Sequence, residues 1–124
     1  MTLAAAAALA LATAVGHSVL SERVLLRALR AEAPAGVLGH PAARRLVVGM
    51  FHLPSVCWAG MAVSMLLLDP QAAGYRATLH IYAAIYALSA GVTFWGIRRP
   101  HPGGFLILSA AALILVSLYA PGAA

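Results

Sequence analysis

Residues 46–68 read LVVGMFHLPSVCWAGMAVSMLLL, and this stretch decides the fold class. It contains no Asp, Glu, Lys or Arg, and its apolar residues form a continuous run rather than alternating with polar ones. A helix needs about 20 such residues to cross about 30 Å of hydrocarbon, whereas a transmembrane β-strand would alternate. The stretch therefore predicts a membrane-spanning helix.

Three further stretches have the same character, at residues 3–20, 77–97 and 103–120. The chain of 124 residues is 63% hydrophobic and only 9% charged, which leaves too few polar side chains to cover a water-soluble domain. We read the first stretch as a helix and not as a signal peptide, because it has no basic start. The sequence predicts an all-α polytopic membrane protein with a single transmembrane domain over residues 1–124. The last two connections are short, so we expect an antiparallel bundle in which the last three helices are neighbours.

The arginines predict an orientation. All eight basic residues are arginine, a usage typical of GC-rich bacterial genomes. Seven lie in the first and third connections: Arg23, Arg27, Arg30, Arg44, Arg45, Arg98 and Arg99. Arginine gathers on the cytoplasmic side of membrane proteins, so both termini should lie outside, in the periplasm, with the chain in the bacterial inner membrane. The net charge of +5 then faces anionic lipid headgroups and not nucleic acid.

Residues 21–30, SERVLLRALR, are amphipathic. They predict either a cytoplasmic extension of the first helix or a short helix in the headgroup plane. Glu22 falls on the apolar side of this segment, where a carboxylate needs a cationic partner. We expect a structural salt bridge to an arginine of a neighbouring connection: Arg44, Arg45, Arg98 or Arg99.

Three histidines lie at membrane depth and are functional candidates, because ionisable groups are costly there. By helical rise, His17 and His52 lie near the cytoplasmic boundary and His80 near the outer one. A compact three-histidine metal site is therefore excluded. His17 and His52 could form a pair of axial haem ligands on adjacent helices, although simple hydrogen bonding of each histidine is the more common case. We expect no cofactor, with haem b or bacteriochlorophyll as the alternatives.

Small residues form two stripes that permit close helix approach. One combines His80 with Ala84, Ala87 and Gly91, and the other pairs Gly60 with Ser64. These stripes predict packing inside the bundle, a contact between copies, or docking against a larger complex. The nearby hydroxyls of Tyr82 and Tyr86 need partners if they are buried.

The segment His17-Ser18-Val19-Leu20-Ser21-Glu22, followed by an arginine-rich connection and Phe51-His52, carries a resemblance. It resembles a group of small uncharacterised bacterial four-helix membrane proteins that often read His-Ser-x-x-Gly-Glu here and Trp-His later. In this chain Ser21 replaces the glycine and Phe51 the tryptophan. The resemblance covers about the first half of the chain and implies a four-helix membrane fold, but no activity.

These features predict a non-catalytic integral membrane subunit that docks in or stabilises a larger membrane protein complex, of which respiratory and photosynthetic assemblies are natural examples. Two alternatives stay open: a haem- or pigment-binding protein that uses His17 and His52, and a small transporter or channel. We expect no enzyme, because no Ser-His-Asp or Cys-His set converges at one depth. Small multidrug transporters are similar in length, but they carry an acid in helix 1, and this chain has none before Glu22.

Overall fold

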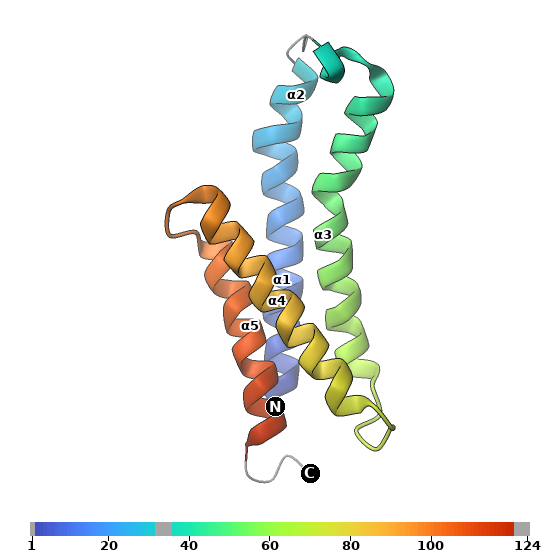
Figure 1. The fold of residues 1–124 in the computed structure, drawn as a ribbon, viewed down its shortest axis with the longest axis vertical. Coiled ribbons are helices and arrows are strands. Elements are labelled where there is room, and N and C mark those ends of the chain that lie inside the picture. Colours follow the sequence, from blue (N-terminus) through green and yellow to red (C-terminus); the bar gives the residue numbers. More distant parts are fainter. Residues whose placement is uncertain (1, 32–35, 121–124) are drawn as a thin grey trace.

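A computed structural model describes residues 2–31 and 36–120 of the chain, and this part is helical without a strand. The four main helices are α1 (Thr2–Leu20), α3 (Pro41–Leu67), α4 (Tyr75–Ile97) and α5 (Pro102–Tyr119) (Figure 1). All four belong to helices that are long and apolar enough to cross a membrane. The predicted all-helical chain with four spans of this kind is confirmed, and it indicates a multi-pass membrane protein.

The first helix does not stop where its apolar run ends. It continues through one wide π-helical segment, η1 (Ser21–Leu26), into α2 (Arg27–Ala31), which makes 30 residues of unbroken helix (Figure 1). Of the two forms predicted for residues 21–30, the structure has the extension. On such an extension the long arginine side chains place their guanidinium groups in water while the backbone stays helical.

The helix α3 begins at Pro41, ahead of the apolar run that predicts it. The short 3₁₀-helical segment η2 (Gly36–Gly39) precedes it. A proline is favoured at the first helical position, because its missing N–H has no intrahelical partner there. The His40 side chain accepts a hydrogen bond from the backbone N–H of Ala42 at 3.3 Å and so caps the helix start.

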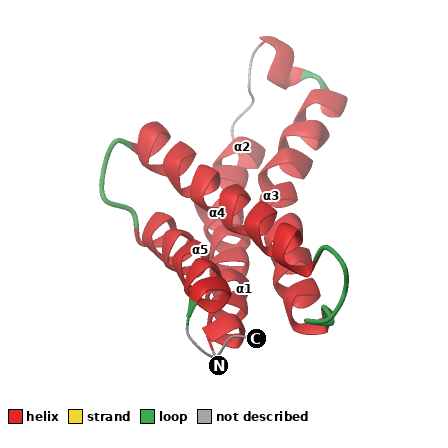
Figure 2. Cartoon of the chain, turned by 60° about the horizontal axis from the view of Figure 1, so that its bottom comes forward, coloured by secondary structure: helices red, strands yellow, loops and turns green. Residues whose placement is uncertain are grey.

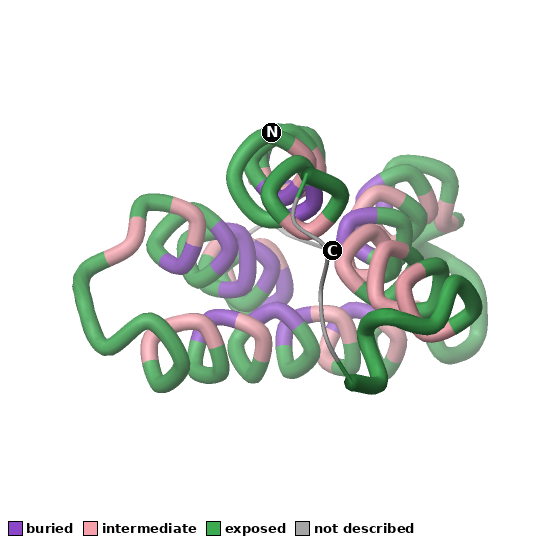
Figure 3. The backbone as a smooth tube through the Cα atoms, turned by 90° about the horizontal axis from the view of Figure 1, so that it is seen from above, coloured by how far each residue is buried: buried purple, intermediate pink, exposed green. Residues whose placement is uncertain are grey.

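The helix α1 lies between α3 and α5 and packs against both of them, and α5 in turn packs against α1 and α4 (Figure 3). The helix α4 packs along α5 but runs obliquely across the molecule, and its backbone is close to that of α3 only at one end (Figures 1 and 2). The short connections predict that α3, α4 and α5 are all neighbours. The structure has this arrangement for α4 and α5, while α1 takes the place beside α3 that α4 was expected to fill.

Small side chains explain how α1 packs between α3 and α5. One face of this helix is almost pure alanine and is fully covered: Ala6, Ala7, Ala10 and Ala14 are at most 3% exposed. The facing side of α5 carries Ala110 and Ala111, which are equally buried. Small side chains allow helix backbones to approach closely, and this packing is a main source of helix association in lipid.

Larger side chains bridge α3 and α4 where their backbones diverge. The buried Tyr86 donates its hydroxyl to the carbonyl oxygen of Trp58 at 3.0 Å. Trp58 Nε1 donates to Ser89 Oγ at 3.3 Å, and Ser64 Oγ lies 2.8 Å from the hydroxyl of Tyr82. Both tyrosine hydroxyls therefore have the partners that burial demands.

Candidate functional site

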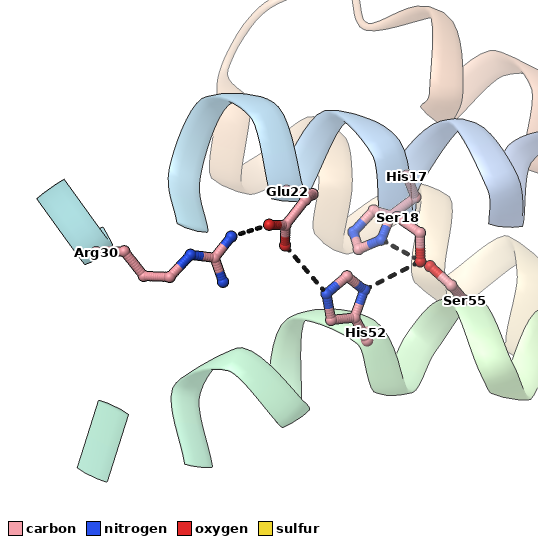
Figure 4. A network of polar contacts seen from close by, with 6 residues as sticks. All are labelled: His17, Ser18, Glu22, Arg30, His52 and Ser55. Atoms are coloured by element: carbon pink, nitrogen blue, oxygen red, sulfur yellow. Dashed lines mark hydrogen bonds and ion pairs between the residues drawn. The ribbon is translucent and has the colours of Figure 1, made fainter. Parts of the chain in front are cut away.

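Six side chains form a polar seam between α3 and the long helix made of α1, η1 and α2. They are His17, Ser18, Glu22, Arg30, His52 and Ser55 (Figure 4). His17 Nδ1 lies 3.0 Å from Ser55 Oγ, and Ser18 Oγ lies 3.1 Å from His52 Nδ1. Each bond joins the two helices, so the seam fixes their relative position.

The register of the seam follows from helical spacing. The two helices run antiparallel (Figure 1), so rising residue numbers on α1 meet falling numbers on α3. Adjacent His17 and Ser18 therefore face Ser55 and His52, which lie one turn apart on α3. Glu22, one turn beyond Ser18, then comes within 3.7 Å of His52 Nε2. Both ring nitrogens of His52 thus have polar neighbours.

Glu22 forms an ion pair with Arg30 on its own helix. Within the described residues it makes none with the arginines of neighbouring connections, so the expected partners Arg44, Arg45, Arg98 and Arg99 are corrected to Arg30 and His52. The reason is the π-helical segment. In a regular α-helix Arg30, eight residues on, would lie about 80° around the axis from Glu22. A π-helical turn contains more residues, so each residue rotates the chain by a smaller angle about the helix axis. The segment η1 therefore brings the guanidinium of Arg30 to the same side of the helix as the carboxylate of Glu22.

A groove of about 810 Å³ opens beside the polar seam. The residues of α1 and η1 from Ala12 to Leu25 form one wall, and the end of α4 and the start of α5 form the other. Trp58 of α3 also lines the groove. Along α1 the lining extends for about 20 Å at about 1.5 Å per residue. The size and the mostly apolar lining match those of small-molecule sites, which have volumes of about 300–1,000 Å³.

Two histidines line this groove, His17 from α1 and His101 from the start of α5. The His17 ring packs edge-on against Trp58, with 5.3 Å between the ring centroids and 75° between the planes. His101 Nδ1 is buried and has no hydrogen-bond partner within the described residues. This nitrogen lies against Gly103, where an added Cβ would come within 3.2 Å of it. His101 was not among the histidines singled out from the sequence, although its place between two prolines at a helix start gave a signal.

The seam does not favour the alternative of a haem held between His17 and His52. The Nδ1 atom of each ring is engaged by a serine of the opposite helix, and His52 Nε2 faces Glu22. Two axial ligands must present free nitrogens to opposite sides of one macrocycle. His52, moreover, is not among the residues that line the groove, whereas His17 is.

The third membrane histidine lies in a different part of the fold. His80 Nδ1 is 2.7 Å from the carbonyl oxygen of Arg76, and its Nε2 is 2.7 Å from the hydroxyl of Tyr119. The guanidinium of Arg76 lies 5.6 Å from the centre of the Tyr119 ring. This cluster joins the start of α4 to the end of α5.

The predicted small-residue stripes are not part of the packed core. Ala84, Ala87 and Gly91 are exposed, because α4 packs through a different face, about 100° around the helix axis, which carries Leu79, Ala83, Tyr86 and Ala90. Gly60 is exposed as well, and Ser64, one turn further along α3, contacts Tyr82.

The four arginines expected as partners of Glu22 divide into two pairs. Arg44 and Arg45 lie in the first turns of α3, where Arg44 Nε donates to the carbonyl oxygen of Leu38 at 3.3 Å. Arg98 ends α4 with a left-handed backbone, φ 53°, and Arg99 follows it exposed.

Comparison with known proteins gives no match to a family model, a curated protein or a solved structure. The seam and the groove are therefore the basis for a functional proposal.

Proposed function

We propose that the chain lies in a bacterial inner membrane as an antiparallel four-helix bundle, with both termini in the periplasm and the arginine-rich connections in the cytoplasm. The distribution of arginine supports this orientation. The end of α2 and the α4–α5 turn, which carry or adjoin most of the arginines, lie toward the same end of the molecule (Figure 1). The turn that carries Asp69 lies toward the other end.

Within that orientation, the function that the geometry supports best is non-catalytic binding of a quinone-like molecule in the groove. Such a ligand has a flat ring with carbonyl oxygens and a hydrocarbon tail. The observation that carries the proposal is the groove itself, with two imidazoles and an indole on a mostly apolar wall that also includes Arg23.

The chemistry of the lining selects this class of ligand. An imidazole N–H donates to a carbonyl oxygen, and His17 and His101 each bring one ring to the groove. The indole of Trp58 offers a flat apolar surface for a ring. The rest of the groove along α1 and η1 is lined mostly by small or apolar residues, with Arg23 as the one charged side chain among the described residues there, and it accommodates a tail. A ligand with these properties reaches the site from the membrane without passing through water.

Tryptophan fluorescence tests this proposal. The chain has two tryptophans: Trp58 lines the groove and is 7% exposed, while Trp95 is 77% exposed. Trp95→Phe leaves Trp58 as the only reporter, and Trp58→Phe leaves Trp95 as a matched control for ligand that merely dissolves in the detergent. Decylubiquinone, which quenches indole fluorescence, is the titrant. We expect saturable quenching of Trp58 and a linear, weaker effect on Trp95.

Histidine variants in the Trp95→Phe background locate the ring of the ligand. Each hydrogen bond to the ligand is worth about 0.5–1.5 kcal/mol, so His17→Ala and His101→Ala should each weaken binding about two- to tenfold. His80→Ala, whose side chain lies in a different cluster, should leave the affinity unchanged. Equal, non-saturable quenching of both tryptophans would refute quinone binding. A haem held by His17 and His52 would instead give a Soret band on haem titration that His52→Ala abolishes.

A second role, as a subunit of a larger membrane complex, is favoured by the exposed stripe on α4. Its small residues are exposed, which leaves them free for a neighbouring helix. Ala87→Leu should then reduce the amount of any larger species on native gels of solubilised membranes. Ala112→Leu, at an exposed position of α5, should not. Equal migration of the two variants with the unaltered chain would count against this role.

A further inference from the structure

A second, smaller hollow lies where α2 ends and α3 begins. It has a volume of about 410 Å³ and is lined by Arg30, Pro41, Arg44, Arg45 and Val48. We call it the arginine hollow. Three of its lining side chains are guanidinium groups, and they come from two helices, α2 and α3. The groove described above has different lining residues throughout.

We propose that the arginine hollow binds a phosphate group. Guanidinium groups present forked N–H donors that match phosphate oxygens in pairs. Basic pockets between transmembrane helices on the cytoplasmic side are a known means of holding anionic lipid headgroups. The hollow combines three such groups around one space that is large enough for a phosphate ester.

The charges of the hollow favour an anion. Arg44 and Arg45 bring two like charges to one space, and a bound anion removes the cost of their repulsion. Within the described residues only Arg30 of the three lining arginines is in an ion pair, with Glu22. The carbonyl oxygen of Leu38 takes one donor of Arg44, which orients the guanidinium and leaves its other N–H groups available.

The start of α3 also contributes positive charge to the arginine hollow. Pro41, the first residue of this helix of 27 residues, lines the hollow. The N-terminal end of a helix carries a partial positive charge and attracts anions. Pro41 and Val48 supply apolar surface beside the charges, which suits the glycerol part of a lipid headgroup as well as a free phosphate.

Thermal unfolding of the full chain in an uncharged detergent tests the proposal. Three titrants distinguish the source of the phosphate: dioctanoyl phosphatidic acid, dioctanoyl phosphatidylcholine as a zwitterionic lipid of the same chain length, and inorganic phosphate. We expect phosphatidic acid to raise the unfolding temperature saturably and phosphatidylcholine to have no effect. Stabilisation by inorganic phosphate as well would identify a site that takes free phosphate.

Matched double variants separate this site from general attraction to the membrane. Arg44→Gln/Arg45→Gln should weaken phosphatidic acid binding by about tenfold for each forked guanidinium–phosphate pair that is removed. Arg98→Gln/Arg99→Gln removes the same charge from the α4–α5 turn and should leave the binding intact. Arg44→Lys/Arg45→Lys keeps the charge but lacks the forked guanidinium. Its affinity for phosphatidic acid should lie between those of the two glutamine double variants, and this variant also controls for misfolding.

Two results would overturn the proposal. One is an absence of stabilisation by both phosphatidic acid and inorganic phosphate. The other is an equal loss of binding in the two glutamine double variants, which would show that only the net charge matters. Neither result bears on the groove, so this inference and the proposed function succeed or fail separately.

Discussion

The hydrogen bond between Ser18 and His52 makes a sharp prediction about how α1 and α3 are held together. The two atoms, Ser18 Oγ and His52 Nδ1, lie 3.1 Å apart, and both side chains are half-buried. Ser18→Ala removes the hydroxyl without adding volume, and His52→Ala removes the ring. The two single variants and the double variant form a cycle that isolates the energy of this one pair.

The structure sets the expected size of the coupling. Interhelical hydrogen bonds in membrane proteins average about 0.6 kcal/mol and reach about 1.7 kcal/mol. The Ser18–His52 bond should lie in the middle of this range, because Glu22 lies 3.7 Å from the other ring nitrogen and polarises the imidazole, while partial exposure weakens the bond. We therefore expect a coupling of about 1 kcal/mol, or about a fivefold change in the folding equilibrium.

Reversible unfolding in mixed micelles of a mild detergent and dodecyl sulfate, followed by circular dichroism, measures this energy. A second cycle with Ser18→Ala and Ser89→Ala is the control, since Ser89 lies on α4 and bonds to Trp58 instead. This control pair should be additive within about 0.5 kcal/mol. If the Ser18–His52 pair is also additive to that limit, the polar seam does not hold the two helices and the account of the site fails.

Two further predictions concern packing. Gly104→Ala should destabilise the fold by about 1–3 kcal/mol in the same unfolding assay, because the new Cβ would lie 2.7 Å from the Phe94 ring. The control Gly91→Ala should be neutral or stabilising, because no atom lies within 4 Å of its added Cβ. Ala10→Leu should separate α1 from its neighbours and lower the unfolding temperature, because Ala10 is 0% exposed, while Ala8→Leu, on the exposed side of the same helix, should be tolerated. Equal unfolding temperatures within either pair would contradict the packing described.

The sequence was sufficient for the number of helices and their approximate places, because a continuous apolar run in lipid has one stable backbone form. It was weaker at the helix ends. Arg44 and Arg45 lie inside α3 and not in the connection before it, since hydropathy measures solvent preference and not backbone conformation. The short turns predicted only that consecutive helices are neighbours, which holds along the whole length for α4 and α5 but not for α3 and α4. Which helices lie side by side depends on how closely their faces approach, and the buried alanines of α1 allow it to pack against both α3 and α5.

The candidate site was predictable only in part. Comparable depth correctly brought His17 and His52 to the same region, and the structure places both in the polar seam. Predicting that Ser18 and Ser55 are their partners requires the rotation of each helix about its own axis, which the depth of a residue in the membrane does not give. The Glu22–Arg30 ion pair depends on the π-helical segment, and a regular helical wheel places these side chains on different stripes. His101 was overlooked because it lies in the turn before α5, outside the apolar runs in which candidates were sought.

Site-directed labelling measures the central claim, that apolar helices cross the bilayer and place the arginine-bearing ends together. Cys57 is the only cysteine, so Cys57→Ser gives a background for Arg44→Cys, Arg98→Cys and Asp69→Cys, each probed with a membrane-impermeant maleimide. In intact cells we expect labelling of the Asp69→Cys variant alone, and in inverted vesicles labelling of the other two. Labelling of the Arg44→Cys and Arg98→Cys variants from opposite surfaces would contradict the four-span account.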